Sequence, residues 1–292
     1  QTGCARAPCA SRGLYETENQ LLRKGNTMSN SRFNLTLGLL LAGVLVAVGQ
    51  PSPLAEQQEA KLIAILKSDA PRKAKADACR ELSPIATAAS VPVLADLLSN
   101  PELNHMARYA LETIPGPAVD DALRATLGKL NGRPLVGVIG SLGVRRDAQA
   151  VPPLSGLLRN TDPDVAQAAA RALGSIGNSA AAKALSEALA DVSAANQVAF
   201  CEGLFRCAES LAAKGEHQAA MTSYDRLRGL SAAPQQGRAG ALRGAVLTRG
   251  NDGIPLLGEA IRSDDYVLVA AAALTAMEMP GASVTKALVD EL

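Results

Sequence analysis

The chain has 292 residues, of which 48% are hydrophobic, and its charges nearly balance, with 29 Lys and Arg against 28 Asp and Glu. A formal net charge of +1 gives no electrostatic reason to expect a nucleic-acid partner, which usually selects a strongly basic face. Aromatic residues make up only 2%, with no Trp, so platforms for stacking bases or sugars are nearly absent. The composition is that of one large globular domain or a solenoid.

The N-terminal part of the chain is predicted to be absent from the mature protein, either because it is not translated or because it is cleaved off. The first Met is Met28, so residues 1–27 are expected to be an untranslated or disordered leader. Residues 28–49 have the pattern of a signal peptide, with a basic Arg32, an apolar core over residues 35–48 and a small-x-small site that ends at Gly49. The core is shorter than the ~20 residues of a membrane span. We expect export to a bacterial periplasm or beyond, without stable membrane insertion after cleavage.

Residues 50–292 are organised by a repeat of about thirty residues. Its first helix can be aligned on one apolar position, occupied by Cys79, Leu111, Ile139, Leu173, Leu204, Leu242 and Leu274. A second helix follows, and three of the second helices open with nearly the same segment, at Val91-Pro92, Val151-Pro152 and Ile254-Pro255. Proline is tolerated in the first turn of a helix. This periodicity predicts an all-α fold, a right-handed α-solenoid of about seven stacked antiparallel hairpins.

The clearest hairpin spans residues 161–191. Thr161 or Asp162 can cap its first helix, and Gly177 is placed to end it in a left-handed conformation. Ser179 is expected to cap the second helix. Such a hairpin is apolar along one side only, so it needs neighbours of its own kind.

The motif Asp162-Pro-Asp-Val165, followed by Ala170-Arg-Ala-Leu-Gly-Ser-Ile-Gly177, resembles the HEAT repeat in its short, phycobilisome-lyase-like form. The resemblance covers about residues 56–292 and is weakest at 191–250. It implies an α-solenoid whose long surface suits protein partners. It also implies an alternative function, that of a bilin lyase-like or chaperone-like enzyme.

The weak region has features of its own. Gly215, Ala220, Tyr224 and Leu227 have the spacing of a tetratricopeptide hairpin, and residues 231–237 are predicted to be a longer loop. We therefore expect one longer hairpin here. At the C-terminus the apolar face of the last helix, which includes Val284 and Leu288, has no predicted partner, so the solenoid is expected to be truncated there and to belong to a longer protein.

The sequence offers few candidates for chemistry. His105 and His217 lie far apart and have no ligand-forming residue at metal-site spacing, so no metal, cofactor or catalytic residue is predicted. Cys79, Cys201 and Cys207 are interpreted as small buried hydrophobic residues.

Charged clusters have ordinary structural interpretations as well. The basic run of residues 72–75, with Arg80, could be an anionic docking patch but fits a solvated helix face better. Asp120-Asp121 and Asp264-Asp265 are expected to stabilise helix starts. Arg145-Arg146 is interpreted as a charged loop.

The leading hypothesis is thus a non-catalytic, exported scaffold for protein–protein interaction. Binding is assigned to exposed positions of the second helices, namely Asp96, Arg124, Glu187 and Glu259. A further alternative makes this chain the repeat module of a larger exported enzyme whose active domain lies beyond residue 292.

Overall fold

The computed structural model describes residues 52–231, 233–279 and 281–290. The predicted leader (1–27) and signal peptide (28–49) lie outside the described residues. Within the described ranges the chain forms α-helices and short 3-10 turns, with no strand.

The helices alternate between two layers after an initial helix, α1 (Pro53–Lys67). The first helices of the hairpins are α2 (Arg72–Leu82), α4 (Asn104–Thr113), α6 (Gly132–Val144), α8 (Pro163–Ile176), α10 (Gln197–Ala213), α12 (Gln235–Arg249) and α14 (Tyr266–Glu278). The second helices are α3 (Val91–Asp96), α5 (Pro117–Thr126), α7 (Val151–Leu157), α9 (Ser179–Ala188), α11 (His217–Arg228), α13 (Ile254–Ile261) and α15 (Ala282–Val289). The 3-10 turns are η1 (Ala88–Ser90), η2 (Leu97–Ser99), η3 (Ala148–Ala150) and η4 (Gly250–Gly253).

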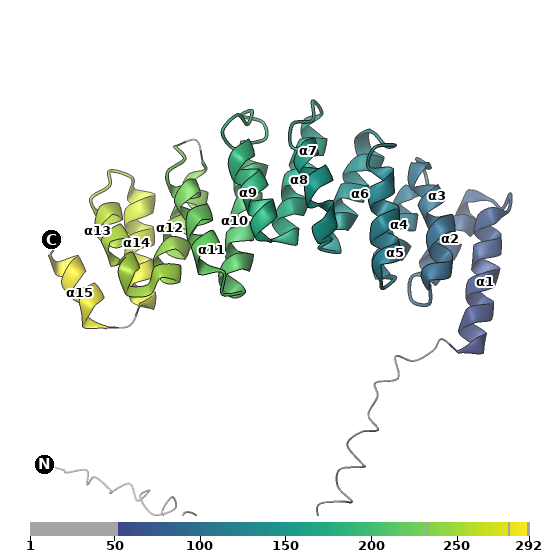
Figure 1. The fold of residues 1–292 in the computed structure, drawn as a ribbon, viewed down its shortest axis with the longest axis horizontal. Coiled ribbons are helices and arrows are strands. Elements are labelled where there is room, and N and C mark those ends of the chain that lie inside the picture. The colour runs from purple at the N-terminus through teal and green to yellow at the C-terminus, as the bar shows by residue number, and fades with distance from the viewer. Residues whose placement is uncertain (1–51, 232, 280, 291–292) are drawn as a thin grey trace, which may run out of the picture. The chain divides into compact units, whose positions relative to one another are not determined.

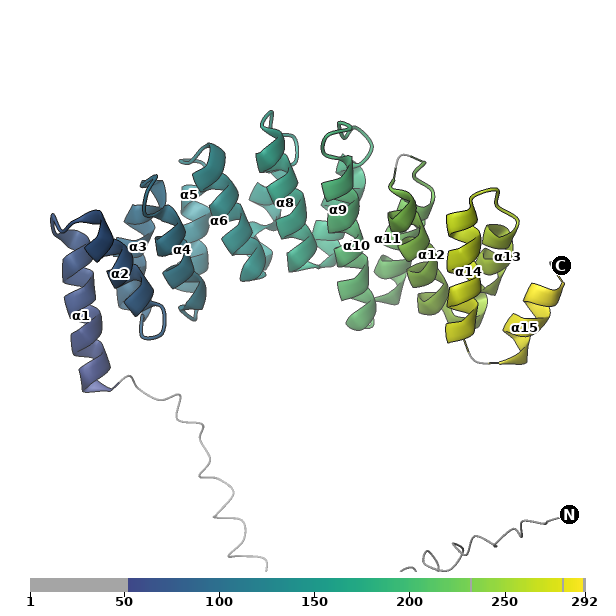
Figure 2. The same ribbon diagram turned by 180° about the vertical axis from the view of Figure 1, so that it is seen from behind.

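Neighbouring hairpins pack against one another, chiefly through their first helices. The first helices contact one another in the order α2, α4, α6, α8, α10, α12, α14. In the second layer α3 contacts α5, α9 contacts α7 and α11, and α13 contacts α15. Figures 1 and 2 show the resulting row of hairpins from opposite sides. The predicted α-solenoid is confirmed, and α1 extends it by one helix at its N-terminal end.

The hairpin of α8 and α9 follows the sequence closely. The Asp162 side chain accepts a hydrogen bond from the Asp164 backbone N–H at 2.9 Å, and Gly177 ends α8 with φ of 60°. The predicted capping residue of α9, Ser179, was wrong by one position. Asn178 is its cap, accepting from the Ala181 N–H at 2.8 Å, whereas Ser179 donates to Glu216 of the next hairpin.

A 3-10 turn precedes three of the second helices, a feature that the sequence pattern did not predict. The turns η1, η3 and η4 lead directly into α3, α7 and α13, whose prolines stand in the first turn as expected. The first of these turns is held by the buried Glu59 of α1. Its carboxylate accepts hydrogen bonds from the Thr87 N–H at 2.8 Å and from the Ser90 hydroxyl at 2.6 Å.

The aligned apolar positions are buried in six of the seven hairpins: Cys79, Leu111, Ile139, Leu173, Leu204 and Leu242. In the seventh, the prediction was wrong. Leu274 is 64% exposed, and the buried residues of α14 are Ala272, Thr275 and Ala276. Because α14 is apolar nearly all round, its sequence does not indicate which face is turned inward.

The hairpin of α10 and α11 is longer than its neighbours, as predicted, since α10 has 17 residues. Phe205 and Tyr224 join its two helices by an edge-to-face contact, with ring centroids 5.9 Å apart. The predicted loop over 231–237 is shorter than expected, because α12 already begins at Gln235.

The buried side chains form two clusters that meet in α12. Ala241 and Ala245 belong to the large cluster that begins at Leu62, whereas Leu242 and Val246 belong to a small cluster shared with α13, α14 and α15. The last two hairpins therefore have a core of their own. In the part of the chain that the structure describes, no helix combines the length and the apolar character needed to cross a membrane.

Candidate functional site

Three of the four predicted binding residues lie at one position of the second helices. Asp96 in α3, Glu187 in α9 and Glu259 in α13 are exposed, and each follows a fully buried leucine by two residues. These leucines are Leu94, Leu185 and Leu257. The same position is Ala125 in α5 and Gly156 in α7, both exposed. We call Asp96, Glu187 and Glu259 the acidic row.

Two members of the acidic row have basic neighbours. Glu187 lies 4.0 Å from Lys183, and both side chains are largely exposed, so this pair contributes little. Glu259 lies 3.4 Å from Arg228 and lines a pocket of about 290 Å³ between α11, α12, α13 and α14. Arg228 and Arg238 also line this pocket, and Arg238 is paired with Asp265 at 2.9 Å. The charges around the pocket therefore balance, and it has no excess of positive charge for an anion.

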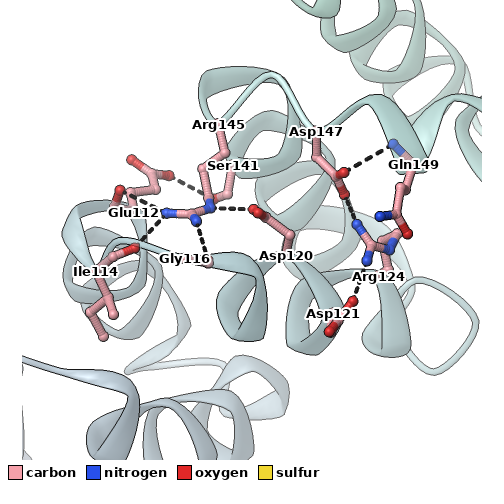
Figure 3. Close-up of polar contacts among 10 residues, drawn as sticks. All are labelled: Glu112, Ile114, Gly116, Asp120, Asp121, Arg124, Ser141, Arg145, Asp147 and Gln149. Carbon is pink, nitrogen blue, oxygen red and sulfur yellow. Dashed lines mark hydrogen bonds and ion pairs between the residues drawn. The ribbon is translucent and has the colours of Figure 1, made fainter.

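The fourth predicted residue, Arg124, is not exposed as expected. Its side chain is 16% exposed and forms ion pairs with Asp121 of its own helix and with Asp147, which is buried in the next hairpin (Figure 3). Asp147 in turn caps η3 by accepting from the Gln149 N–H at 3.0 Å. Arg124 thus connects two hairpins and is unsuited to contact a partner.

Arg145, which the sequence analysis placed in a charged loop, is also largely buried. Its side chain is 11% exposed and pairs with Asp120 in the preceding hairpin (Figure 3). The same guanidinium donates to the carbonyl oxygens of Ile114 at 2.8 Å and Gly116 at 2.9 Å. It therefore neutralises a carboxylate and also satisfies carbonyl groups at the end of α4, which the helix itself leaves without partners.

Similar contacts occur at two other junctions. The Lys214 ammonium, just after α10, donates to the Gly177 carbonyl at 2.9 Å, and Arg249 at the end of α12 pairs with Asp225 of α11. A basic residue at the end of a first helix thus reaches back to the preceding hairpin in all three cases. These residues hold the hairpins together, which is a structural role.

The remaining charged clusters are also locally paired. Arg72 lies 3.7 Å from Glu102, and Arg80 pairs with Asp77, so the basic run around residues 72–75 is partly neutralised. Asp265 caps α14 as predicted, accepting from the Val267 N–H at 3.0 Å. Asp120 lies in the first turn of α5, as predicted, and it also binds Arg145.

The candidate nucleophiles are buried. The prediction that Cys79, Cys201 and Cys207 are core residues is confirmed, since each is at most 4% exposed. Burial raises the pKa of the Cys79 thiol to about 11 and that of Cys207 to about 12, so both are protonated at neutral pH. His105 and His217 are exposed. Among the described residues, no three His, Cys, Asp or Glu side chains are grouped so that they could hold a metal ion.

Comparison with known proteins locates the repeat in the middle of the chain. Residues 135–199 match the family model of HEAT repeats. No curated protein matches the sequence. An engineered protein of known structure is similar at 22% identity and a TM-score of 0.44, over 80% of this chain and 71% of that chain.

Two further solved structures have lower TM-scores. Human deoxyhypusine hydroxylase in complex with glycerol is similar at 13% identity and a TM-score of 0.37, over 76% of this chain and 96% of that chain. A second engineered protein has 21% identity and a TM-score of 0.32, over 79% and 97% of the two chains. These similarities are too low to transfer an activity. The match identifies residues 135–199 as HEAT repeats, and they lie within a continuous row of helical hairpins.

Proposed function

We propose that the chain is a non-catalytic, exported bacterial scaffold that binds a protein partner along its second helices. The observation that supports this function is the acidic row. Three carboxylates occupy the same position of the second helices and are exposed on one layer, whereas Arg124 and Arg145 are largely buried and join hairpins. A long surface of this kind suits an extended partner.

The spacing of the row defines the partner's chemistry. Asp96 and Glu187 are separated by three hairpin steps, and neighbouring helices pack about 8–10 Å apart, so the two carboxylates are roughly 25–30 Å apart. An extended segment of about nine residues would span this distance at about 3.3 Å per residue. Ala125 and Gly156, which lie between them, leave room for its backbone. We expect a partner segment with basic residues near both ends.

The test is capture of the partner from the exported fraction of the source cell. The full chain is compared with a triple variant, Asp96→Lys, Glu187→Lys and Glu259→Lys. Capture by the variant should be lost, and capture by the wild type should weaken at high salt because exposed charges are screened. Arg124 is left unchanged, since its replacement would disturb the junction with Asp147.

The matched control reverses three exposed acidic residues that lie outside the row, Glu81, Asp191 and Glu209. It has the same net charge as the test variant and should retain the partner. Equal loss in both variants would show that only net charge matters, and undiminished capture by the test variant would exclude the row. Turnover by the purified chain, or a covalent bilin adduct, would contradict the non-catalytic assignment.

A further inference from the structure

The position of the acidic row is occupied by an arginine in α11. The buried residues of α11 match those of α9, with Ala220, Tyr224 and Leu227 corresponding to Ala181, Leu185 and Ala188. Counted from these pairs, Arg226 corresponds to Glu187. The helices α9, α11 and α13 therefore place Glu187, Arg226 and Glu259 at one position of the repeat, and the signs of the three charges alternate.

The charge of Arg226 is not used to hold the fold together. Its side chain is half-buried, and among the described residues it forms no ion pair. Arg228, two residues later, pairs with Glu259 at 3.4 Å, and the arginines that join hairpins, Arg124 and Arg145, are also paired with carboxylates. Arg226 is therefore the arginine of this layer whose charge is left for a partner.

The carboxylates on either side of Arg226 are accessible, although each has a basic neighbour. The side chains of Glu187 and Glu259 are each 65% exposed. Ion pairs between exposed side chains contribute little, so a partner can compete with Lys183 and Arg228 at small cost. The three positions thus present an accessible pattern of negative, positive and negative charge.

The spacing of this pattern selects a backbone conformation for the partner. Helices α9 and α11 are in contact, and the Arg228–Glu259 pair joins α11 to α13. Neighbouring helices pack about 8–10 Å apart, so consecutive charges are separated by about that distance. In a β-strand the side chains on one face recur about every 7 Å, and every third residue points to the opposite face. A polyproline II helix has three residues per turn of about 9 Å, so every third side chain faces the same way.

We infer that this surface binds a polyproline II segment in which every third residue is charged, in the order basic, acidic, basic. The basic residues lie opposite Glu187 and Glu259, and the acidic residue lies opposite Arg226. The inference rests on the proposed function, to which it adds the partner's backbone conformation and its acidic residue.

Two further features suit this partner. Asp96 and Glu187 are three hairpin steps apart, and nine residues of polyproline II span about 28 Å, which matches that separation. The described part of the chain contains no strand, so it has no sheet edge with which an extended partner could pair its backbone. A segment that keeps its backbone solvated and binds through its side chains fits such a surface.

The experiment measures the binding of two synthetic peptides to the full chain by fluorescence anisotropy at low salt. One peptide contains Lys-Pro-Pro-Glu-Pro-Pro-Lys, and the other has lysine in place of the glutamate; proline favours the polyproline II conformation in both. The wild type should bind the first peptide about threefold or more tightly, because the contact with Arg226 changes from repulsive to attractive. A surface that responds only to positive charge would prefer the second peptide.

Variants of Arg226 test which residue sets this preference. Arg226→Glu should reverse it, Arg226→Gln should remove it, and Arg226→Lys should retain it. The control is Arg133→Glu, which makes the same charge change at an exposed residue in the first turn of α6 and should leave the preference as in the wild type. Circular dichroism should show all four variants folded. A third peptide, Lys-Pro-Glu-Pro-Lys, has the wrong spacing and should bind about threefold or more weakly than the first.

The outcomes separate this inference from the proposed function. Absence of binding by either long peptide, preference of the wild type for the second peptide, or an unchanged preference in Arg226→Glu would overturn the inference. Equal effects of Arg226→Glu and Arg133→Glu, or equal binding of the third peptide, would do so as well. The acidic row would survive these results if Glu187→Lys still weakened the second peptide. The proposed function fails separately, if the triple variant of the acidic row retains the partner.

Discussion

Two glycines at the same place in the repeat motif should respond in opposite ways to substitution by alanine. Gly140 in α6 and Gly174 in α8 each follow the buried apolar residue of their helix and precede a serine. A Cβ added at Gly174 would lie 2.8 Å from the Gly203 Cα and 2.9 Å from the Gly203 oxygen, both backbone atoms of α10. A Cβ added at Gly140 would meet no atom within 4 Å.

The two effects that compete can be compared in size. Replacing a glycine inside a helix by alanine stabilises it by up to about 1 kcal/mol. Crowding in a well-packed core costs about 1–3 kcal/mol, and the backbone of α10 cannot move aside as a flexible side chain could. Gly140→Ala should therefore raise the free energy of unfolding by about 0.5–1 kcal/mol, and Gly174→Ala should lower it by about 1 kcal/mol.

Urea titration followed by far-UV circular dichroism measures both changes. The midpoints should move in opposite directions while the slopes stay the same, because the surface exposed on unfolding is unchanged. If both variants are stabilised alike, α8 and α10 do not approach as closely as described. A changed slope in one variant would indicate that the solenoid no longer unfolds as one unit.

Three further predictions concern Arg145, Cys207 and the N-terminus. Arg145→Ala should lower the free energy of unfolding by about 2–4 kcal/mol, because Asp120 and the carbonyls at the end of α4 lose a charged donor. The control is Arg159→Ala, at an exposed site, which should change the free energy of unfolding by less than about 0.5 kcal/mol in the same urea titration. The pKa of Cys207 is raised from 9.0 to about 12 by burial, so this thiol ionises at lower pH in the unfolded chain than in the folded one. The free energy of unfolding should therefore fall between pH 9 and about pH 12. The fall should be shallower in Cys207→Ala, and an unchanged pH profile would exclude this thiol as a cause. Mass spectrometry of the exported protein should find Gln50 at the N-terminus, whereas peptides from residues 1–27 would contradict the predicted start at Met28.

The regular part of the fold could be predicted from the sequence because each hairpin contains its own signals. Asp162, Pro163 and Gly177 act within a few residues of their position, and the apolar period places Leu173 in the core. These signals fail where the local pattern is ambiguous. Asn178 and Ser179 are both good capping residues in adjacent positions, and the apolar sequence of α14 is compatible with several inward faces.

The charged residues were harder to predict because their partners lie in another hairpin. Arg124 looks exposed within its own helix, and only the stacking of hairpins brings it to Asp147. A sequence signal for such contacts does exist. An aspartate in a second helix precedes, by 24 or 25 residues, an arginine at the end of the next first helix, as in Asp120 with Arg145 and Asp225 with Arg249. The acidic row does not follow from the repeat alignment either, because Asp96 and Glu259 lie 17 residues after their aligned residues, Cys79 and Leu242, whereas Glu187 lies 14 residues after Leu173. It becomes visible when the second helices are aligned on their buried leucines.

The division of the core at α12 has a consequence for how the chain opens. Solenoid hairpins are stabilised by their immediate neighbours, so a boundary between two clusters is where local unfolding can stop. The small cluster behind α13, α14 and α15 holds few large side chains, and its amides should exchange with solvent before those of α6, α8 and α10. Glu259 lies in the last two hairpins, which contain the small cluster, whereas Asp96 and Glu187 lie in hairpins of the large cluster. A partner that engages all three residues would therefore slow hydrogen exchange in the last two hairpins.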